Sequence, residues 1–232
     1  MVKLRRILAL IICICMFCIP VEAAGQEKLV ALTFDDGPSG RFTERLLEGL
    51  RQRNTKATFL LCGYRIELYP QLTEQIIEDG HEIGLHGYSH KSMEHMCKRD
   101  VEQEIKQSLE LLPEDYKVAF LRPPGGLYSP NVQAAAQEQD LSLLHWSVDP
   151  KDWATNNTEA IKKAVLNQVR DGDVILLHDM SDSSVNAALA IVDTLQAQGF
   201  RFVTASELAN LRNITLTPGQ KYERIEKQKD VK

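Results

Sequence analysis

The amino-acid sequence predicts an α/β fold in which a parallel sheet is covered by helices. Short apolar segments with strand character alternate with segments of helical periodicity along most of the 232 residues. Residues 173–177 are apolar at almost every position, which is typical of a parallel strand buried on both faces. Polar residues stand where the expected strands end. A chain of this length with 44% hydrophobic residues suits one domain around one core.

Each expected element follows from its local pattern. Strands are expected where short runs of apolar, β-branched or aromatic residues stand between turn residues. They cover residues 29–32, 56–63, 81–85, 118–121, 141–148, 173–177 and 200–203. Helices are expected where apolar residues recur at helical spacing, and they cover residues 41–53, 66–80, 100–112, 131–139, 158–170, 184–198 and 204–211. This alternation predicts β-α-β units, which build parallel sheets with outer helices.

Residues 1–24 have the features of a secretory signal peptide. Three basic residues precede an apolar run from Ile7 to Ile19, and two alanines close the segment. An uncleaved N-terminal anchor is the alternative, although the run is short for a membrane span of ~20 residues. Either interpretation places the rest of the chain outside the cytoplasm, secreted or associated with the cell envelope.

Composition narrows the possible partners. The net charge is −5, and no basic block occurs outside the first few residues and the last ones, so nucleic acid is not an expected partner. No pattern indicates an obligatory protein partner, and a monomer is expected. Residues 213–232 are expected to form a charged, flexible tail, because apolar periodicity is lost from Thr217. The domain is then expected to span residues 25–212.

Two cysteines, Cys62 and Cys97, lie beyond the leader segment. In an exported protein they could form one disulfide. Cys62 lies in a buried-strand pattern, however, and a small apolar core residue is the alternative interpretation.

Two adjacent carboxylates, Asp35 and Asp36, follow the first expected strand and precede a Gly-Pro turn. Burying two ionised carboxylates is costly unless cations or donors meet them. Other polar residues stand at the ends of later strands: His86, His90, Arg122, Asp149, Asp152 and His178. The carboxyl ends of barrel strands form one face, and in barrels of this class that face carries the active site.

The spacing of His86 and His90 allows a metal site. On a helical turn, residues four apart place both imidazoles on one face. With Asp36 as a third, acidic ligand they would form a two-histidine, one-carboxylate set with an open position for water, the pattern of a catalytic zinc site. Exposed or hydrogen-bonded imidazoles on a loop are the alternative. A zincin-type protease fits poorly, because His81, Glu82 and His86 give HExxxH and not HExxH.

Three further residues have both a functional and a structural interpretation. His178 follows an apolar run and is either a satisfied core histidine or a titratable group in a cleft. Asp152 could hold and charge this histidine, or it could be an exposed turn residue. Arg122 precedes two prolines and suits a bidentate pair with a carboxylate, whereas a surface ion pair is the alternative.

The ordered set of these segments resembles a known family. The five motifs of polysaccharide deacetylases, the NodB-like carbohydrate esterase family 4, are matched by TFDDGPS (33–39), HGYSH (86–90), RPPGG (122–126), DPKDW (149–153) and LLHD (176–179). The resemblance covers roughly residues 28–212, and its first motif is very specific. It implies a distorted (β/α) barrel with about seven parallel strands. It also implies an exported, metal-dependent hydrolase that removes N-acetyl groups from N-acetylglucosamine residues of peptidoglycan or chitin-like glycans.

The resemblance implies a division of labour between the two adjacent acids. Asp36 would bind the metal together with His86 and His90. The metal is usually zinc in this family, and Co²⁺, Ni²⁺ or Mn²⁺ are other possibilities. Asp35 would be the general base for the attacking water, and Arg122 would pair with it and orient it.

The resemblance also implies an acid and a substrate pocket. His178 would be the general acid that protonates the leaving amine, with Asp152 as its carboxylate partner. The pocket for the acetyl methyl group would be lined by Trp153 and Leu177. Next to Pro124, the backbone N–H of Gly125 would help to hold the oxyanion.

Three positions depart from the family pattern: Gly87 where Ser or Thr is usual, Gly125 where an aromatic residue is common, and Leu85 where a polar residue is frequent. The first departure removes a hydroxyl that steadies the histidine loop, and the second opens the cleft. None removes a metal ligand or a proton-transfer group, which argues against a catalytically silent glycan-binding wall protein. An O-deacetylase of the acetylxylan esterase type remains the alternative, since the residues do not distinguish an amide from an ester.

Overall fold

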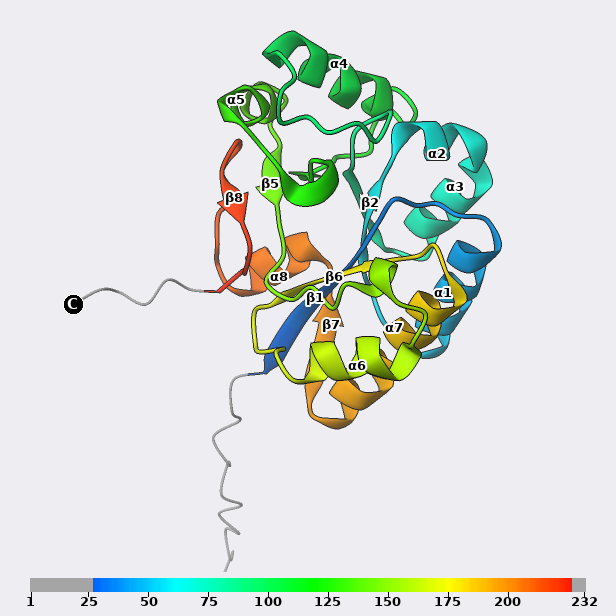
Figure 1. Ribbon diagram of the computed structural model, residues 1–232. Coiled ribbons are helices and arrows are strands. Elements are labelled where there is room, and N and C mark those ends of the chain that lie inside the picture. Colours follow the sequence, from blue (N-terminus) through cyan, green and yellow to red (C-terminus); the bar gives the residue numbers. More distant parts are fainter. Residues whose placement is uncertain (1–26, 227–232) are drawn as a thin grey trace, which may run out of the picture.

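The structure is a computed structural model that describes residues 27–226. The expected signal peptide or anchor, residues 1–24, lies outside the described residues. Within the described part, no helix is long and apolar enough to cross a membrane. Figure 1 shows helices arranged around the outside of a curled sheet.

The observed elements follow the expected alternation. The strands are β1 (Lys28–Asp35), β2 (Thr58–Leu61), β3 (Glu82–Leu85), β4 (Phe120–Leu121), β5 (Ser142–Leu144), β6 (Val174–His178), β7 (Phe200–Val203) and β8 (Lys221–Tyr222). The α-helices are α1 (Arg41–Gln52), α2 (Gly63–Leu68), α3 (Pro70–Glu78), α4 (Lys98–Leu109), α5 (Pro130–Glu138), α6 (Thr158–Leu166), α7 (Asp182–Ala197) and α8 (Ala205–Leu211). Two 3₁₀ turns, η1 (Pro124–Gly126) and η2 (Asp152–Ala154), follow β4 and β5.

The single helix expected over residues 66–80 is two helices, α2 and α3. They meet at Tyr69, whose φ of −132° and ψ of 57° are not helical. Pro70 is the cause, because proline lacks an N–H and disfavours the helical conformation of the residue before it. Pro70 instead begins α3, a position where its missing N–H costs nothing.

The strands form one parallel sheet that curls into a distorted barrel, as expected. Its order is β6-β1-β2-β3-β4-β5-β8, and β7 pairs with the first half of β1. Strand β1 is therefore central, since its second half pairs with both β2 and β6. Beyond β5, Val148 forms an isolated bridge to Ile175 of β6, which brings the two sides of the curl together. The strand expected over 141–148 is thus a short strand followed by this single bridge.

The flexible tail expected from residue 213 is corrected by the structure for its described part. Lys221 and Tyr222 form β8, which pairs in parallel with β5. Tyr222 and Ile225 are buried, and Ile225 N–H donates to the carbonyl of Gly172 at 2.9 Å. Two apolar residues are too few to produce a periodic pattern, so this packing could not be predicted from the sequence.

The side chains of β1 alternate between the two faces of the sheet, and this alternation directs Asp35 toward the site. Val30, Leu32 and Phe34 pack into the large cluster beneath the outer helices, whereas Leu29 and Ala31 belong to a smaller cluster that includes residues of α8 and β8. Successive side chains of a strand point to opposite faces. Asp35 therefore continues the face of Leu29 and Ala31, and it reaches the carboxyl end of the barrel interior.

Both cysteines of the described part are free thiols. Cys62 is fully buried and Cys97 is exposed. The interpretation of Cys62 as a small core residue is confirmed in the structure.

Candidate active site

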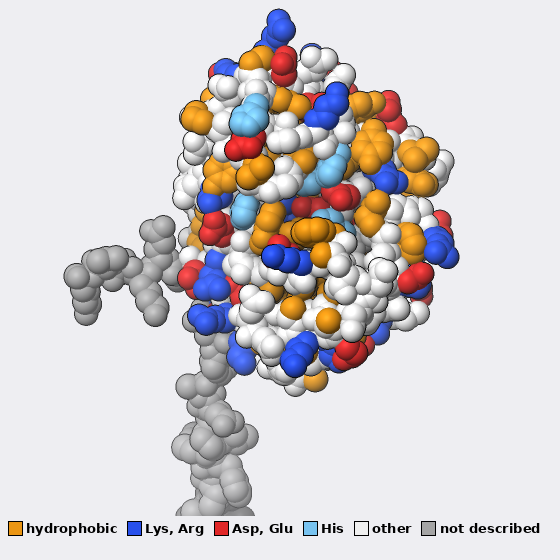
Figure 2. Space-filling view, in the orientation of Figure 1, with side chains coloured by type: hydrophobic (Ala, Val, Ile, Leu, Met, Phe, Trp, Pro, Cys, Tyr) orange, Lys and Arg blue, Asp and Glu red, His pale blue; other side chains and the backbone are white. Residues whose placement is uncertain are grey.

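A cavity of about 420 Å³ opens at the carboxyl ends of the strands. Figure 2 shows acidic side chains and histidines gathered at the centre of this face, among apolar ones. Its lining includes most of the residues expected from the sequence: Asp35, Asp36, His86, His90, Gly125, Trp153 and His178, with Trp146, Asp149 and Leu176 in addition. One cavity thus joins residues of all five motifs, which lie far apart along the chain.

The three expected metal ligands converge. Asp36 Oδ1 lies 3.3 Å from His86 Nε2 and 2.9 Å from His90 Nε2. One ligand atom from each residue lies within 4.8 Å of the others. Asp36 and His90 are partly exposed toward the cavity, whereas the side chain of His86 is buried. The group is open on one side, as a site that must also admit a substrate requires.

The loop that carries the two histidines is not the helical turn expected from their spacing. Residues 86–91 have no helical assignment, and both Gly87 (φ 76°) and His90 (φ 59°) adopt the left-handed conformation. Asp36 does so too, with φ 73°. Such backbone is uncommon outside glycine and is concentrated at functional sites. The two imidazoles meet, with ring centroids 5.2 Å apart, because the loop folds back.

The tautomer of His86 suits metal binding. Its Nδ1 lies 2.7 Å from the carbonyl oxygen of Arg122. A carbonyl accepts but does not donate, so Nδ1 carries the proton and the lone pair of Nε2 faces Asp36 and His90. Metal-bound histidines are usually oriented by such a second bond. Two imidazole nitrogens and a carboxylate oxygen are a donor set that zinc and similar divalent ions accept.

Electrostatics favour an ionised Asp36. Burial acts to raise the pKa of Asp36, but the neighbouring imidazoles of His86 and His90 outweigh it and hold this pKa well below its usual range. Contact with Asp36 in turn raises the pKa of His90. The carboxylate is therefore available as an anionic ligand throughout the neutral range.

Glu104 of α4 clamps the histidine loop, a role that the sequence did not indicate. One carboxylate oxygen accepts from the backbone N–H of Tyr88 (2.8 Å) and of Ser89 (2.7 Å), and the other accepts from the Ser89 hydroxyl (2.7 Å). At Gly87 a Cβ would lie 2.7 Å from Met93 Cε and 3.3 Å from the Glu104 carboxylate. A side chain at position 87 would thus meet Met93 first and would need the left-handed backbone of Gly87, while Glu104 holds the two residues that follow.

Asp35 is held by a fully buried arginine. Arg122 Nη1 donates to Asp35 Oδ1 at 2.5 Å and to Thr33 Oγ1 at 3.0 Å. The remaining guanidinium donors reach the carbonyls of Leu144 and His145, both at 2.8 Å. A buried guanidinium fixed at four points can neutralise and orient a buried carboxylate. The functional interpretation of Arg122 is therefore supported over a surface ion pair.

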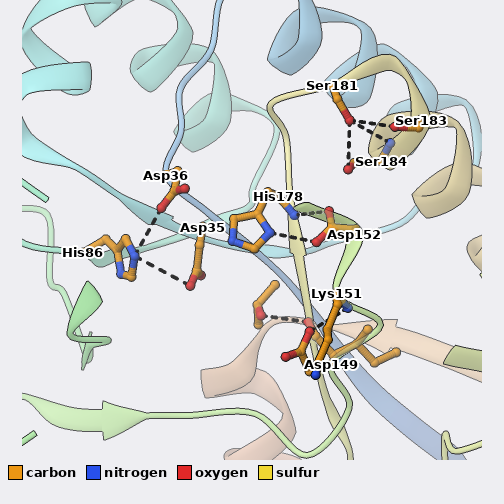
Figure 3. Close-up of polar contacts among 12 residues, drawn as sticks. Asp35, Asp36, His86, Asp149, Lys151, Asp152, His178, Ser181, Ser183 and Ser184 are labelled. Carbon is orange, nitrogen blue, oxygen red and sulfur yellow. Dashed lines mark hydrogen bonds and ion pairs between the residues drawn. The ribbon is translucent and has the colours of Figure 1, made fainter. Parts of the chain in front are cut away.

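His178 and Asp152 form a second histidine–carboxylate unit. Asp152 is buried, and its two oxygens lie 2.8 Å from His178 Nδ1 and 2.9 Å from the His178 backbone N–H. Burial acts to lower the pKa of His178, but Asp152, together with the charges of Asp35 and Asp36, outweighs it and raises the pKa to about 9. Figure 3 shows the ring between Asp152 and Asp35. At neutral pH the ring carries a proton near the cavity, as a general acid must.

The pocket residues are partly as expected. Trp153 and Gly125 line the cavity, whereas Leu177 does not: Leu177 is fully buried in the core cluster, and Leu176 takes its place. The reason is the two-residue period of β6, which sends Leu176 and His178 to the same face. Pro124 is buried beside the cavity and is not among its lining residues.

Two further residues at this site, Trp146 and Asp179, were given no role from the sequence, although Asp179 ends the LLHD motif. Trp146 lines the cavity and stacks on His145 with ring centroids 4.0 Å apart. Asp179 is buried, accepts from the Thr43 hydroxyl, and would lie 2.6 Å from a Cβ at position 37. Burial raises the pKa of Asp179 to about 6. Asp179 therefore requires glycine at position 37 and anchors the turn after Asp36.

Comparison with known proteins agrees with this geometry. A family model described as polysaccharide deacetylase matches residues 22–144. A peptidoglycan-N-acetylglucosamine deacetylase of Bacillus cereus is 37% identical over 198 residues, which cover 83% of this chain and 93% of the relative. A chitooligosaccharide deacetylase of Sinorhizobium fredii is 33% identical over 198 residues, covering 78% and 92%. One similar solved structure is a family 4 acetyl xylan esterase from Clostridium thermocellum in complex with a cobalt ion. It superposes with a TM-score of 0.80 and is 33% identical, and the match covers 85% of this chain and 99% of that one.

Proposed function

Since this chain belongs to the polysaccharide deacetylase family, we propose that it is an exported, metal-dependent enzyme that removes N-acetyl groups from N-acetylglucosamine residues of peptidoglycan or chitin-like glycans. The observation that carries the proposal is the meeting of three units in one cavity: the Asp36–His86–His90 cluster, the Asp35–Arg122 pair and the His178–Asp152 pair. The expected signal peptide is the support for export. The names of the similar deacetylases support the substrate class.

The first unit provides the metal site. Asp36, His86 and His90 would hold the ion, zinc or another divalent cation such as Co²⁺, Ni²⁺ or Mn²⁺. When bound, such an ion polarises a carbonyl and lowers the pKa of water to about 7. The carbonyl of Arg122 keeps the Nε2 lone pair of His86 directed toward the other ligands, and Glu104 keeps the loop of His90 in place.

The second unit provides the base. Arg122 binds Oδ1 of Asp35, and Oδ2 lies on the other side, 3.8 Å from His86 Nε2. Oδ2 is therefore next to the ligand cluster, where it can take a proton from the attacking water. The buried guanidinium of Arg122 holds Oδ1 and so fixes the direction in which Oδ2 points.

The third unit provides the acid. Amide cleavage must protonate the departing nitrogen, because an amine anion is a poor leaving group. His178 holds a proton at neutral pH through its bond to Asp152, and its Nε2 is free to donate into the cavity. Apolar surface from Leu176 and Trp153 can receive the acetyl methyl group.

The experiment is a product assay by mass spectrometry. Purified protein is supplied with Zn²⁺ or Co²⁺ and a panel of acetylated glycans: chitooligosaccharides, muropeptides and acetylated xylan. We expect acetate release from the N-acetylated glycans, with metal content measured on the same sample. Release from acetylated xylan alone would favour the O-deacetylase alternative, which the similarity to the acetyl xylan esterase supports. Absence of release from every glycan at full metal occupancy would contradict the proposal.

A further inference from the structure

The C-terminal segment of residues 219–225 fills the seam between β5 and the start of β6. It contains β8 and lies beyond residue 144, where the match to the family model ends. We infer that this segment is a positioning element of the catalytic centre, which holds the backbone that binds Arg122 and thereby sets the position of Asp35. The inference rests on the proposed function, because it takes Asp35 as the base.

On one side the segment holds the end of β5. The pairing of β4 with β5 ends at Leu143, whereas the pairing of β8 with β5 continues to Leu144, whose partner is Tyr222. One residue further, the His145 N–H donates to the Tyr222 carbonyl at 2.7 Å. Figure 1 shows β8 beside β5. The backbone of Leu144 and His145 is therefore held in place by the C-terminal segment.

The same two residues anchor the guanidinium of Arg122. Arg122 Nε donates to the Leu144 carbonyl and Nη2 donates to the His145 carbonyl, both at 2.8 Å. The third nitrogen, Nη1, donates to Asp35 Oδ1 at 2.5 Å. Because a guanidinium is planar and rigid, a shift of the two carbonyls is passed on to Asp35. Misplacement of a catalytic group by ~1 Å can cost about 10²-fold in rate, so the position of these carbonyls bears on catalysis.

On its other side the segment is fixed to the start of β6 by an ion pair with a buried carboxylate. Arg224 Nε and Nη2 both lie 2.6 Å from Oδ1 of Asp173, whose side chain is fully buried. The Ile225 N–H donates to the Gly172 carbonyl at 2.9 Å. The same Asp173 oxygen accepts from the Ser147 hydroxyl at 2.7 Å. Arg224 thus ties the segment to β6 and, through Asp173, to the stretch that follows β5.

Arg224 is the side chain at which these contacts can be loosened without removing the segment. It is partly exposed, so its replacement leaves no large cavity in the core. In Arg224→Gln the carboxylate of Asp173 keeps two donors, the Ser147 hydroxyl and the Arg170 N–H at 2.6 Å. The variant should therefore fold, while the segment loses its charged attachment to β6.

The first test compares the kinetics of Arg224→Gln with those of the wild-type protein, both loaded with Zn²⁺. We expect kcat for acetate release from chitooligosaccharides to fall about tenfold, because Arg122 holds Asp35 less firmly. The Kd for Zn²⁺ should change less than twofold, since the ligand cluster lies on other loops. Arg224→Lys keeps the cation and should recover most of the lost kcat.

A second measurement does not depend on activity. In NMR spectra the side-chain Nε–H of Arg122 reports its bond to the Leu144 carbonyl, because a buried and bonded N–H exchanges slowly with solvent. We expect this exchange to be about tenfold faster in Arg224→Gln and close to the wild-type rate in Arg224→Lys. Glu223→Gln is the matched control, since Glu223 is the neighbouring residue and pairs with Lys221 at the surface. It should change neither kcat nor the exchange.

Urea denaturation gives the folded fraction of each variant at the assay temperature. An unchanged kcat together with an unchanged Arg122 exchange rate in Arg224→Gln would overturn the inference. A loss of activity no larger than the loss of folded protein would overturn it too. Failure of the proposed function has a different signature: the wild-type protein releases no acetate from any glycan, while the Arg122 exchange still responds to Arg224→Gln.

Discussion

The active cavity contains two histidine–carboxylate units with the same functional groups and different surroundings. Asp36 is partly exposed and is shared by two imidazoles, His86 and His90. Asp152 is completely buried and serves one imidazole, His178, through both the ring and the backbone N–H. The first arrangement directs two ring nitrogens and a carboxylate oxygen at a common point, which suits a cation. The second fixes a proton on the ring, which suits an acid.

The comparison indicates that the two units differ because of their backbone conformation, since their residue types are the same. Asp36 and His90 adopt left-handed conformations that turn their side chains toward one another. His178 is the last residue of the regular strand β6 and has an ordinary extended position. Asp35 lies between the two units and has Arg122 as its own partner.

The largest effect is expected at Asp35. Asp35→Asn removes the proposed base but keeps the shape and one acceptor for Arg122. General-base catalysis contributes roughly 10²–10⁴-fold, so kcat should fall by about that factor. Acetate release from chitooligosaccharides measures this, and circular dichroism confirms the fold. Retention of more than a tenth of the activity would assign the base to another residue.

The next largest effect is a change of pH profile in Asp152→Asn. A general acid must be protonated, so activity falls as pH rises through the pKa of His178, which Asp152 holds at about 9. Without that charge the pKa should fall toward its ordinary value near 6.5, and the alkaline limb should move to lower pH. At pH 8 we expect a loss of roughly tenfold or more, largely recovered at pH 6. An unchanged alkaline limb would assign the acid to another group.

A smaller effect is expected in Glu104→Gln, which weakens the clamp on the histidine loop. Partners of metal-binding residues typically affect affinity about 10–100-fold. Calorimetric titration with Zn²⁺ should show a weaker Kd with a largely unchanged kcat at saturating metal. Glu102→Gln is the matched control, since Glu102 lies on the same helix and pairs with Lys98 at the surface. Equal affinities in both variants would show that the clamp is not needed.

The smallest effect on catalysis is expected at Leu176 and Leu177. Replacement of Leu177 should change mainly the stability of the fold, whereas replacement of Leu176 should change mainly the kinetics. Leu177→Ala removes a fully buried side chain from the core and should lower the free energy of unfolding by about 2–5 kcal/mol. Leu176→Ala alters the cavity wall and should mainly raise KM. Urea denaturation and steady-state kinetics measure the two effects. The reverse result would restore Leu177 to the pocket.

Much of this site could be predicted from the chain, because each functional group follows a strand. Parallel strands end at a common face, so Asp35, Arg122 and His178 were expected to meet. The break at Tyr69 was also predictable, since Pro70 carries a local signal that outweighs helical periodicity.

Other features depend on tertiary structure that no local pattern contains. Glu104 reaches the histidine loop from a helix fifteen residues further along, and its spacing has no special meaning in the sequence. Whether Leu176 or Leu177 lines the cavity depends on which face of β6 meets it. The two-residue alternation along the strand could have indicated that Leu176 shares the face of His178. The strand β8 is specified by pairing with β5, since its own two residues have no recognisable pattern.

The most direct test of the account is metal binding in two variants that differ by one position, Asp35→Ala and Asp36→Ala. Metal content and the Kd for Zn²⁺ are measured on both, with acetate release on the same samples. The account predicts that Asp36→Ala loses the metal and its activity, whereas Asp35→Ala keeps the metal and loses activity alone. Equal loss of metal in the two variants would contradict the division of labour between the adjacent carboxylates.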